Sequence, residues 1–345
     1  MHVTLIVPAP FDTVSGGYGY DRRIVAELRA RGHEVAVTEL PGRYPVPDDI
    51  ARDAACTTLE RMGHGTKTVI DGLALPAFAG LGDAFASFGV VGLLHHPTSL
   101  EAGLSEPDRQ LLHDTEQLLF RRLRRSIVTS EPTADGLVKD FGLRRDTVSV
   151  VLPGTDDAPR SKGSQSPTVH ILSIGTLIPR KGHDLLLRAL ARLFDLDWRV
   201  TIVGGDTADP AHAAMLKSLA AELGIADRTT FAGTVVGLAL EALWQSHDLF
   251  ALATQHEGYG MVVAESLKRG LPTVVTDGGA AGSLLADGAG LVCPVGDRDQ
   301  LSKTLRRLIF SADLRHDYAD AAWRAGQSLP TWADQAALFA EALAN

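Results

Sequence analysis

Short apolar runs alternate with stretches of helical spacing along most of the chain. The runs are almost continuously apolar, as expected for parallel strands that are covered on both faces. In the first half they lie at 2–9, 33–40, 68–75, 90–96, 126–131 and 148–154. In the second half they lie at 169–176, 198–204, 228–233, 249–254, 272–277 and 290–295. Strands that alternate with helices predict an α/β fold with doubly wound parallel sheets.

The helical stretches fall between these runs and define the organisation of the chain. Helices are expected at 20–31, from about 107 to 125, and at 182–193, 210–223, 239–246, 261–268 and 331–344. The stretch 161–167, SKGSQSP, is polar and has the composition of a linker. It predicts a first Rossmann-like domain at 1–160 and a second at 168–328. Two open sheets joined in this way would place a ligand cleft at the carboxyl ends of their strands.

Composition narrows the class of protein. The chain of 345 residues is long enough for two cores, and its charged content of 22% is typical of a globular protein. The net charge of −9 argues against nucleic acid as a partner. Cys56 and Cys293 form neither a disulfide framework nor a metal cluster, which favours a cytoplasmic location. The first ten residues resemble a strand more than a secretory signal, and no apolar stretch has the length of a membrane span.

The most informative stretch is 256–277, HEGYGMVVAESLKRGLPTVVTD. It contains Glu257 and Glu265 on either side of a glycine turn and the apolar beginning of a helix. The turn brings the amides of Gly258, Tyr259, Gly260, Met261 and Val262 to a helix N-terminus, which suits a phosphate or a sugar oxygen. A carboxylate accepts two hydroxyl hydrogen bonds, so we expect Glu265 to bind a ribose diol and Glu257 to face a sugar. The alternative for each glutamate alone is an exposed side chain without function.

The spacing Glu257-Gly258-Tyr259-Gly260 to Glu265, followed by Gly270-Leu271-Pro272, resembles the E-x7-E signature of the retaining glycosyltransferases of the GT4 family. The resemblance implies the GT-B fold, with an acceptor domain at 1–160 and a nucleotide-sugar domain at 168–328. It also implies that the terminal segment 329–345 crosses back to the first domain. The implied reaction transfers a sugar from a UDP- or GDP-sugar to an unidentified acceptor, without a metal or other cofactor.

Two segments of the first half could contact the donor. Gly16 and Gly17 lie between the first strand and the first helix, where their amides could meet a diphosphate, although a flexible loop would have the same composition. His95 follows the fourth strand and precedes a proline that extends the backbone. The resemblance implies that His95 contacts the transferred sugar, with His96 as second choice. Glu101 is a candidate for the acceptor side.

Arg180 and Lys181 stand at the entrance of the expected helix at 182–193. Basic residues at a helix N-terminus are unfavourable unless an anion lies between them, which indicates a diphosphate site. By resemblance Lys181 stabilises the leaving diphosphate. The family has an arginine five positions earlier, where this chain has Thr176, so Arg180 is a possible substitute. The catalytic candidates are therefore His95, Glu257 and Lys181.

Other functions remain open at this level. A sugar-nucleotide epimerase or a phosphorylase on the same fold, or an inactive nucleotide-sugar-binding regulator, would share most of these residues. The arginines at 121, 122, 124 and 125 end an amphipathic helix, which could touch an anionic membrane but more often marks a solvated helix end.

Overall fold

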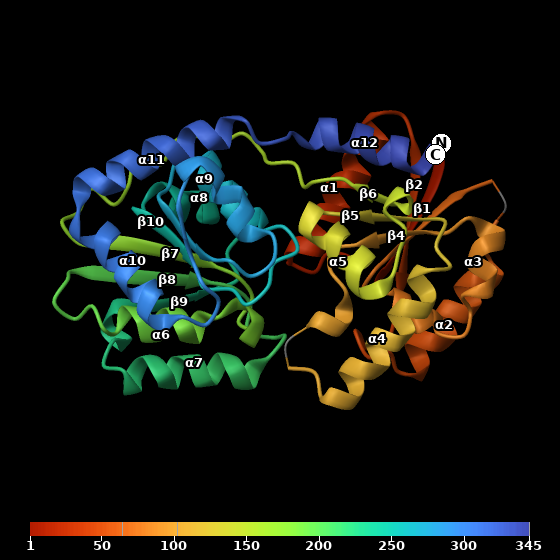
Figure 1. The fold of residues 1–345 in the computed structure, drawn as a ribbon, viewed down its shortest axis with the longest axis horizontal. Helices are drawn as coiled ribbons and strands as arrows, with labels where there is room; N and C mark the ends of the chain where they lie inside the picture. The colour runs from red at the N-terminus through yellow and green to blue at the C-terminus, as the bar shows by residue number, and fades with distance from the viewer. Residues whose placement is uncertain (64, 102, 345) are drawn as a thin grey trace. The chain divides into compact units, whose positions relative to one another are not determined.

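The computed structural model describes residues 1–63, 65–101 and 103–344 (Figure 1). The chain forms two compact units, one of Met1–Gly154 with Pro330–Asn345 and one of Thr155–Leu329. Asn345, in the range expected for the terminal helix, lies outside the described residues. Each unit is built around its own parallel sheet.

The sheet of the first unit has six parallel strands in the order β2-β1-β3-β4-β5-β6. The central pairings place Leu5 between Val37 and Val69. β4 and most of β3 are fully buried, which is why their sequences are continuously apolar. The strands are β1 His2–Pro8, β2 Glu34–Leu40, β3 Lys67–Asp71, β4 Val91–Leu94, β5 Arg125–Val128 and β6 Val148–Val150.

Helices flank this sheet, and side-chain caps fix where several begin. The helices are α1 Gly16–Ala30, α2 Asp49–Glu60, α3 Asp83–Phe88, α4 Glu106–Phe120, α5 Glu131–Phe141 and α12 Trp332–Ala344, with the short 3₁₀ turns η1 Leu75–Phe78, η2 Thr98–Leu100 and η3 Arg145–Thr147. The side chains of Asp48, Ser105 and Ser130 accept hydrogen bonds from backbone amides in the first turns of α2, α4 and α5. α1 begins four residues before the predicted position, at Gly16.

The terminal helix α12 packs against α1 in the first unit (Figure 1). Gly154 lies so close to Trp332 that a Cβ there would be 2.3 Å from the backbone nitrogen of Trp332. The Trp332 ring meets Tyr20 of α1 edge to face, with centroids 5.8 Å apart. These contacts explain why the last residues belong to the same compact unit as the first.

The sheet of the second unit has the order β12-β11-β10-β7-β8-β9 and is also parallel. Its strands are β7 Val169–Ile174, β8 Trp198–Val203, β9 Thr229–Gly233, β10 Leu249–Leu252, β11 Thr273–Thr276 and β12 Leu291–Cys293. Its helices are α6 His183–Leu190, α7 Pro210–Glu222, α8 Gly237–Gln245, α9 Met261–Lys268, α10 Arg298–Phe310 and α11 Ala312–Gln327, with 3₁₀ turns η4 Pro179–Lys181, η5 Ala226–Arg228 and η6 Ala281–Gly288. A core rich in leucine, which includes the buried Trp198, lies between sheet and helices.

The polar stretch 161–167 is attached to the second unit. The Ser161 amide donates to the Arg269 carbonyl at 2.9 Å, and the Ser164 amide donates to Asp248 Oδ1 at 2.8 Å. The compact units therefore divide a few residues earlier than this stretch, between Gly154 and Thr155.

In both sheets the strand order reverses once. The chain leaves β1 toward β2 and returns to β3 on the other side; it likewise leaves β7 toward β8 and returns to β10. At such a reversal the loops after the two strands separate to opposite faces, and ligands of open α/β sheets bind there. The carboxyl ends of β1 and β3, and of β7 and β10, are thus the places to look for function.

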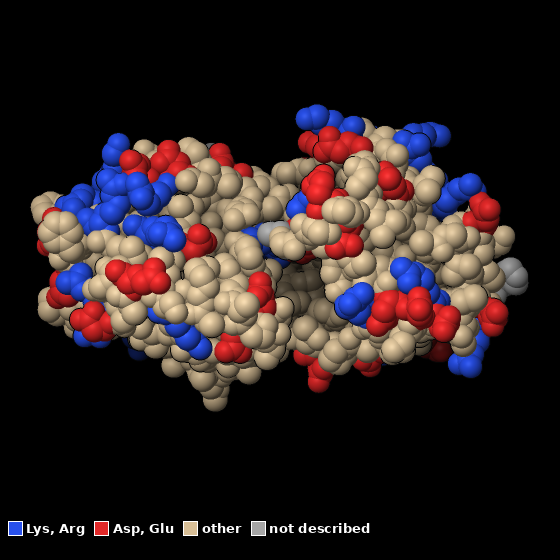
Figure 2. Space-filling model, turned by 90° about the horizontal axis from the view of Figure 1, so that it is seen from below, with Lys and Arg blue, Asp and Glu red and all other residues tan. Residues whose placement is uncertain are grey.

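The distribution of surface charges and the apolarity of the helices are two further features of the described residues. Figure 2 shows acidic and basic side chains side by side over one face of the molecule. Within the described residues, no helix combines the length and apolarity that crossing a bilayer requires.

Candidate active site

The loop that follows β7 brings two cations to the strand reversal of the second sheet. It forms the turn η4 and ends at Gly182, whose backbone is left-handed with φ of 63°. A Cβ on Gly182 would lie 1.9 Å from the Ala253 carbonyl oxygen, so only glycine allows this loop to approach the one after β10. Lys181 Nζ lies 2.5 Å from Glu257 Oε1, and Arg180 donates to the His256 carbonyl at 2.7 Å.

Glu257 is the centre of this group. Its backbone is held by a bridge to Gly279 in the loop after β11, and its side chain is buried. Oε1 accepts from Lys181 and from the Thr254 hydroxyl at 3.1 Å, and lies 3.7 Å from Arg180 Nη1. Burial alone would raise the pKa of Glu257, but the charges of Lys181 and Arg180 outweigh it and lower the pKa below its ordinary value. The glutamate is therefore a buried anion that orders two cations.

The glycine turn continues into α9. Gly260 is the N-cap of the helix, with φ of 100°, a conformation that favours glycine. Met261 and Val262 occupy the first turn, where a helix leaves its amides without intrahelical partners. Tyr259 is buried, and burial raises its pKa to about 12; within the described residues its hydroxyl has no hydrogen-bond partner. The start of α9 thus has backbone amides without intrahelical partners, and the binding role of residues 258–262 stays a prediction.

Glu265 lies on α9 and makes no hydrogen bond or ion pair with Lys181, Arg180 or Glu257 in the described structure. Burial, reinforced by Asp156 and Glu241 and opposed by Arg269, raises the pKa of Glu265 to about 7. Arg269 does not neutralise its carboxylate, because the guanidinium binds the side chain of Glu241 and the backbone carbonyl of Glu265. Among the described residues, this half-buried carboxylate forms no ion pair with a lysine or an arginine.

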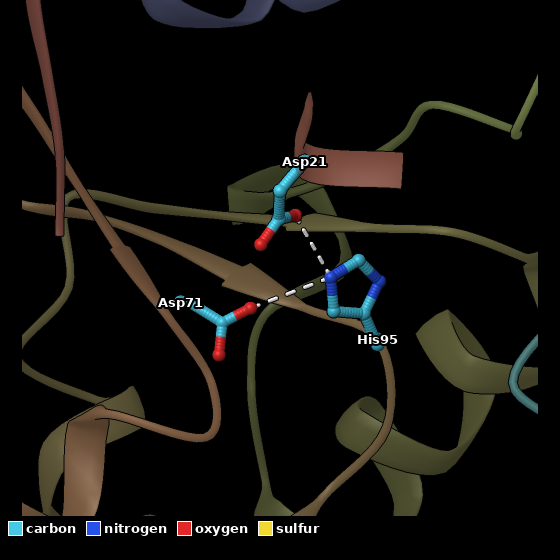
Figure 3. A group of neighbouring side chains, drawn as sticks. All are labelled: Asp21, Asp71 and His95. Atoms are coloured by element: carbon cyan, nitrogen blue, oxygen red, sulfur yellow. Dashed lines mark hydrogen bonds and ion pairs between the residues drawn. The ribbon is translucent and has the colours of Figure 1, made fainter. Parts of the chain in front are cut away.

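The first unit has a second group of ionisable side chains (Figure 3). His95 directly follows β4, Asp71 is the last residue of β3, and Asp21 projects from α1. His95 Nε2 lies 3.0 Å from Asp21 Oδ1 and 3.4 Å from Asp71 Oδ2. The two carboxylate side chains are 1% and 6% exposed, against 19% for the imidazole.

The electrostatics of this group follow from its burial. Burial raises the pKa of Asp21, and so does the neighbouring Asp71, while His95 opposes the shift. Burial alone would lower the pKa of His95, but the two carboxylates raise it well above its ordinary value. The ligand-type atoms of the three residues lie within 4.8 Å of one another. The distance of 3.0 Å is that of an N–H···O hydrogen bond, so a proton on Nε2 accounts for the arrangement.

His96 was the second candidate for contact with the sugar. Its side chain lies against another residue than the aspartates that His95 contacts. Its Nε2 lies 2.6 Å from Glu101 Oε1, so the two side chains form a hydrogen bond within their own loop. That loop is also fixed by Glu116 of α4. The buried Glu116 carboxylate accepts hydrogen bonds from the amides and hydroxyls of both Thr98 and Ser99. His95 is therefore presented by a firmly held loop.

Gly16 and Gly17 are the first two residues of α1 rather than part of a loop. Their amides lie at a helix N-terminus, as an anion site requires. Gly17 also lies against His95: a Cβ there would be 3.2 Å from His95 Cδ2, whereas a Cβ on Gly16 would meet nothing within 4 Å.

The sequence reading did not identify Asp21, Asp71 and Glu116. Asp71 ends a buried strand, and a polar residue at the carboxyl end of a parallel strand is a signal that could have found it. Asp21 and Glu116 carry no such signal, because each is an ordinary acidic residue within a helix.

Two six-stranded parallel sheets with flanking helices are the GT-B fold, and comparison with solved structures confirms that prediction. The sucrose-phosphate synthase of Thermosynechococcus elongatus superposes with a TM-score of 0.82 over 99% of this chain and 98% of its own, at 16% identity. HepE of Anabaena, solved with UDP-glucose, superposes with a TM-score of 0.77 over the whole of both chains, at 18% identity.

Sequence comparison then gives the family. Residues 155–324, about half of the chain, match the model of the glycosyl transferases group 1. A D-inositol 3-phosphate glycosyltransferase of Nocardia farcinica is 30% identical over 227 residues, which are 57% of this chain and 50% of that protein. The chain spans half or less of the length of the curated relatives it matches first. The resemblance read from the E-x7-E spacing is confirmed.

Proposed function

We propose that this protein is a retaining glycosyltransferase that moves a sugar from a nucleotide-sugar, a UDP- or GDP-sugar, to an acceptor hydroxyl. The observation that carries the proposal is the convergence of Lys181, Arg180 and Glu257 at the strand reversal of the second sheet. Two cations and one carboxylate leave one positive charge in excess. An excess of positive charge at this position suits a diphosphate.

Each residue of the second unit receives a role from its surroundings. Lys181 and Arg180 stabilise the charge that grows on the diphosphate as the bond from the sugar carbon to oxygen breaks. The amides of Gly258 to Val262 bind phosphate or sugar oxygens at the N-terminus of α9. Glu265 accepts hydrogen bonds from the ribose diol, and Glu257, while it orders Lys181, contacts the donor sugar through its second oxygen. The acceptor oxygen forms the new bond to the sugar carbon, and its proton passes to the departing diphosphate oxygen.

In the first unit we assign contact with the transferred sugar to His95 and contact with phosphate to the amides of Gly16 and Gly17. Lys181 and Arg180 supply the positive charge that a divalent ion supplies in other transferases, so the reaction should need no metal. The HepE complex with UDP-glucose makes UDP-glucose the first donor to test.

The test is nucleotide release from a panel of UDP-, GDP- and ADP-sugars, with and without sugar, sugar-phosphate and lipid-linked acceptors, in the presence of EDTA. The matched variants are Lys181→Gln and Lys217→Gln. Lys217 is a half-exposed lysine of α7 near Asp206, and its loss should not change the rate. Loss of Lys181 should lower the rate about 100- to 1,000-fold, as removal of a charge-stabilising donor does in other enzymes.

Other results point to the other functions. Tight binding of one nucleotide-sugar without release under any acceptor would indicate the inactive regulator. Conversion of the donor without an acceptor, with the nucleotide retained, would indicate an epimerase. Release that depends on inorganic phosphate would indicate a phosphorylase. Binding of none of these donors would contradict every form of the proposal.

A further inference from the structure

The imidazole of His95 is bound on one side only. Figure 3 shows both carboxylates directed at the same ring nitrogen, Nε2, while the other nitrogen lies on the far side of the ring. In the described structure, Nδ1 of His95 has no hydrogen-bond partner. The three side chains come from α1, β3 and the end of β4, at the strand reversal of the first sheet.

We propose that Asp21 and Asp71 are a positioning pair for His95, which hold its Nε2–H between them and present Nδ1–H as a hydrogen-bond donor to an oxygen of the bound substrate. That the oxygen belongs to a nucleotide-sugar rests on the proposed function. The orientation and protonation of the ring do not rest on it, because they follow from the ligand-free structure.

Charge balance favours a ring that is protonated on both nitrogens. Two buried carboxylates face His95, and within the described residues neither forms an ion pair with a lysine or an arginine. The other titratable neighbours are Tyr18 and Tyr20 of α1, whose hydroxyls donate to the carbonyls of Pro8 and Val151. Their pKa values are raised, so they remain neutral. The imidazolium is thus the available cation, and burying carboxylates without one would be costly.

Packing prevents the ring from turning to expose the other nitrogen. Tyr20 meets it edge to face, with centroids 5.3 Å apart. Gly17 closes another side, where a Cβ would stand 3.2 Å from Cδ2. Tyr20 is itself held by Trp332 and by its hydroxyl. The nitrogen that faces away from the carboxylates is therefore fixed by the fold.

The direct test is the titration of the imidazole nitrogens by ¹⁵N NMR on the full, ligand-free chain, with the His95 signals assigned by their loss in His95→Asn. Both nitrogens should still be protonated at pH 8. Asp21→Asn and Asp71→Asn should each lower the midpoint by about one pH unit or more. Glu101→Gln removes the partner of His96 and should leave the His95 midpoint unchanged.

The proposal would be overturned if His95 were neutral at pH 7. It would also be overturned if the midpoint of the His95 titration were unchanged in both aspartate variants. If either variant fails to fold, the wild-type titration decides alone. Stoichiometric Mn²⁺ gives a further outcome. Broadening of the His95 signals that EDTA reverses would mean that the carboxylates bind a metal ion rather than an imidazolium, and would also overturn the proposal.

A second test asks which nitrogen acts. The side-chain amide of asparagine places its nitrogen near the position of Nδ1, and that of glutamine places it near the position of Nε2. His95→Asn should therefore retain more of the rate constant for nucleotide release than His95→Gln, by about tenfold, with a smaller change in KM. The reverse order would contradict the role of Nδ1. If wild-type protein releases no nucleotide, the proposed function fails, and the NMR titration still decides the positioning of His95.

Discussion

The two units place ionisable groups at the same point of the fold and give them opposite balances of charge. At the reversal of the second sheet, two cations surround one carboxylate, Glu257. At the reversal of the first sheet, two carboxylates surround one imidazole, His95. The topology therefore provides the position, and the local residues decide the chemistry.

The difference is visible in the pKa of each buried acid. The pKa of Glu257 is lowered, because Lys181 and Arg180 outweigh the cost of burial. The pKa of Asp21 is raised by burial and by Asp71, because one imidazole does not offset two carboxylates. The excess of positive charge in the second unit fits the diphosphate that we propose binds there. In the first unit the excess charge around His95 is negative, and we propose that this group orients a hydrogen-bond donor.

Removing the charge of Glu257, which pairs with Lys181 and Arg180 in the second unit, should have the largest effect on the stability of the protein. Glu257→Gln leaves the partly buried cations Lys181 and Arg180 beside a neutral amide, and we expect the free energy of unfolding to fall by about 3 kcal/mol. Urea unfolding followed by tryptophan fluorescence measures the change. Glu222→Gln, an exposed position of α7, is the control and should change the value by less than about 0.5 kcal/mol.

The difference in unfolding free energy between wild type and Glu257→Gln should also depend on pH, and this gives a sharper form of the same test. Because the folded-state pKa of Glu257 is below the ordinary value of 4.5, its contribution is full above pH 4.5 and is lost as the pH falls through the folded value. The difference between wild type and Glu257→Gln should therefore shrink in acid. A difference that grows below pH 4.5 would contradict the ion pair.

In the first unit Glu116, which holds the loop that follows His95, should have the next largest effect on stability. Glu116→Gln replaces one accepting oxygen by an NH₂ group that faces donors of Thr98 or Ser99, and we expect a loss of about 2 kcal/mol in unfolding free energy. Thermal unfolding measures it. Glu106→Gln on the same helix is exposed and should cost well under 1 kcal/mol. Equal losses of stability in Glu116→Gln and Glu106→Gln would show that Glu116 does not hold the His95 loop.

The sequence predicted the fold well because its strands are buried on both faces. All twelve apolar runs correspond to strands of the two sheets. Helices α2, α3, α5, α10 and α11 were not predicted. In α2 only Ala51 and Ala55 are buried, and small residues give a weak apolar period. α1 was predicted four residues short, because its first turn is rich in glycine.

The sequence predicted which candidate residues lie together only where they are close to one another along the chain. Glu257, the glycine turn and Glu265 fall within one stretch, so their spacing could be read directly. The pairing of Lys181 with Glu257 depends on β7 lying beside β10, and the enclosure of His95 depends on β1, β3 and β4 together with α1. Such contacts join distant segments, and no local pattern specifies them.

The two units also differ in how donor binding should respond to pH. The pKa of Glu265 is raised to about 7, so about half of the free protein carries a protonated carboxyl there at neutral pH. Only the carboxylate accepts both ribose hydrogen bonds, so nucleotide affinity should increase by up to about tenfold between pH 6 and pH 8. Isothermal titration calorimetry measures the change, and Glu265→Gln should abolish the pH dependence. A dependence that persists in this variant would assign it to another group.

The smallest expected effect compares two adjacent glycines of the first unit. Gly17→Ala would place a Cβ 3.2 Å from His95 Cδ2, so the ring must move by a few tenths of an ångström, whereas Gly16→Ala meets no atom within 4 Å. Both residues lie in the first turn of α1, so the change in helix propensity is similar and cancels in the comparison. Gly17→Ala should shift the ¹³C and ¹⁵N resonances of the His95 ring, and Gly16→Ala should leave them in place. Equal shifts in both variants would mean that His95 responds to α1 as a whole, and the contact with Gly17 would then contribute nothing to holding the ring between Asp21 and Asp71.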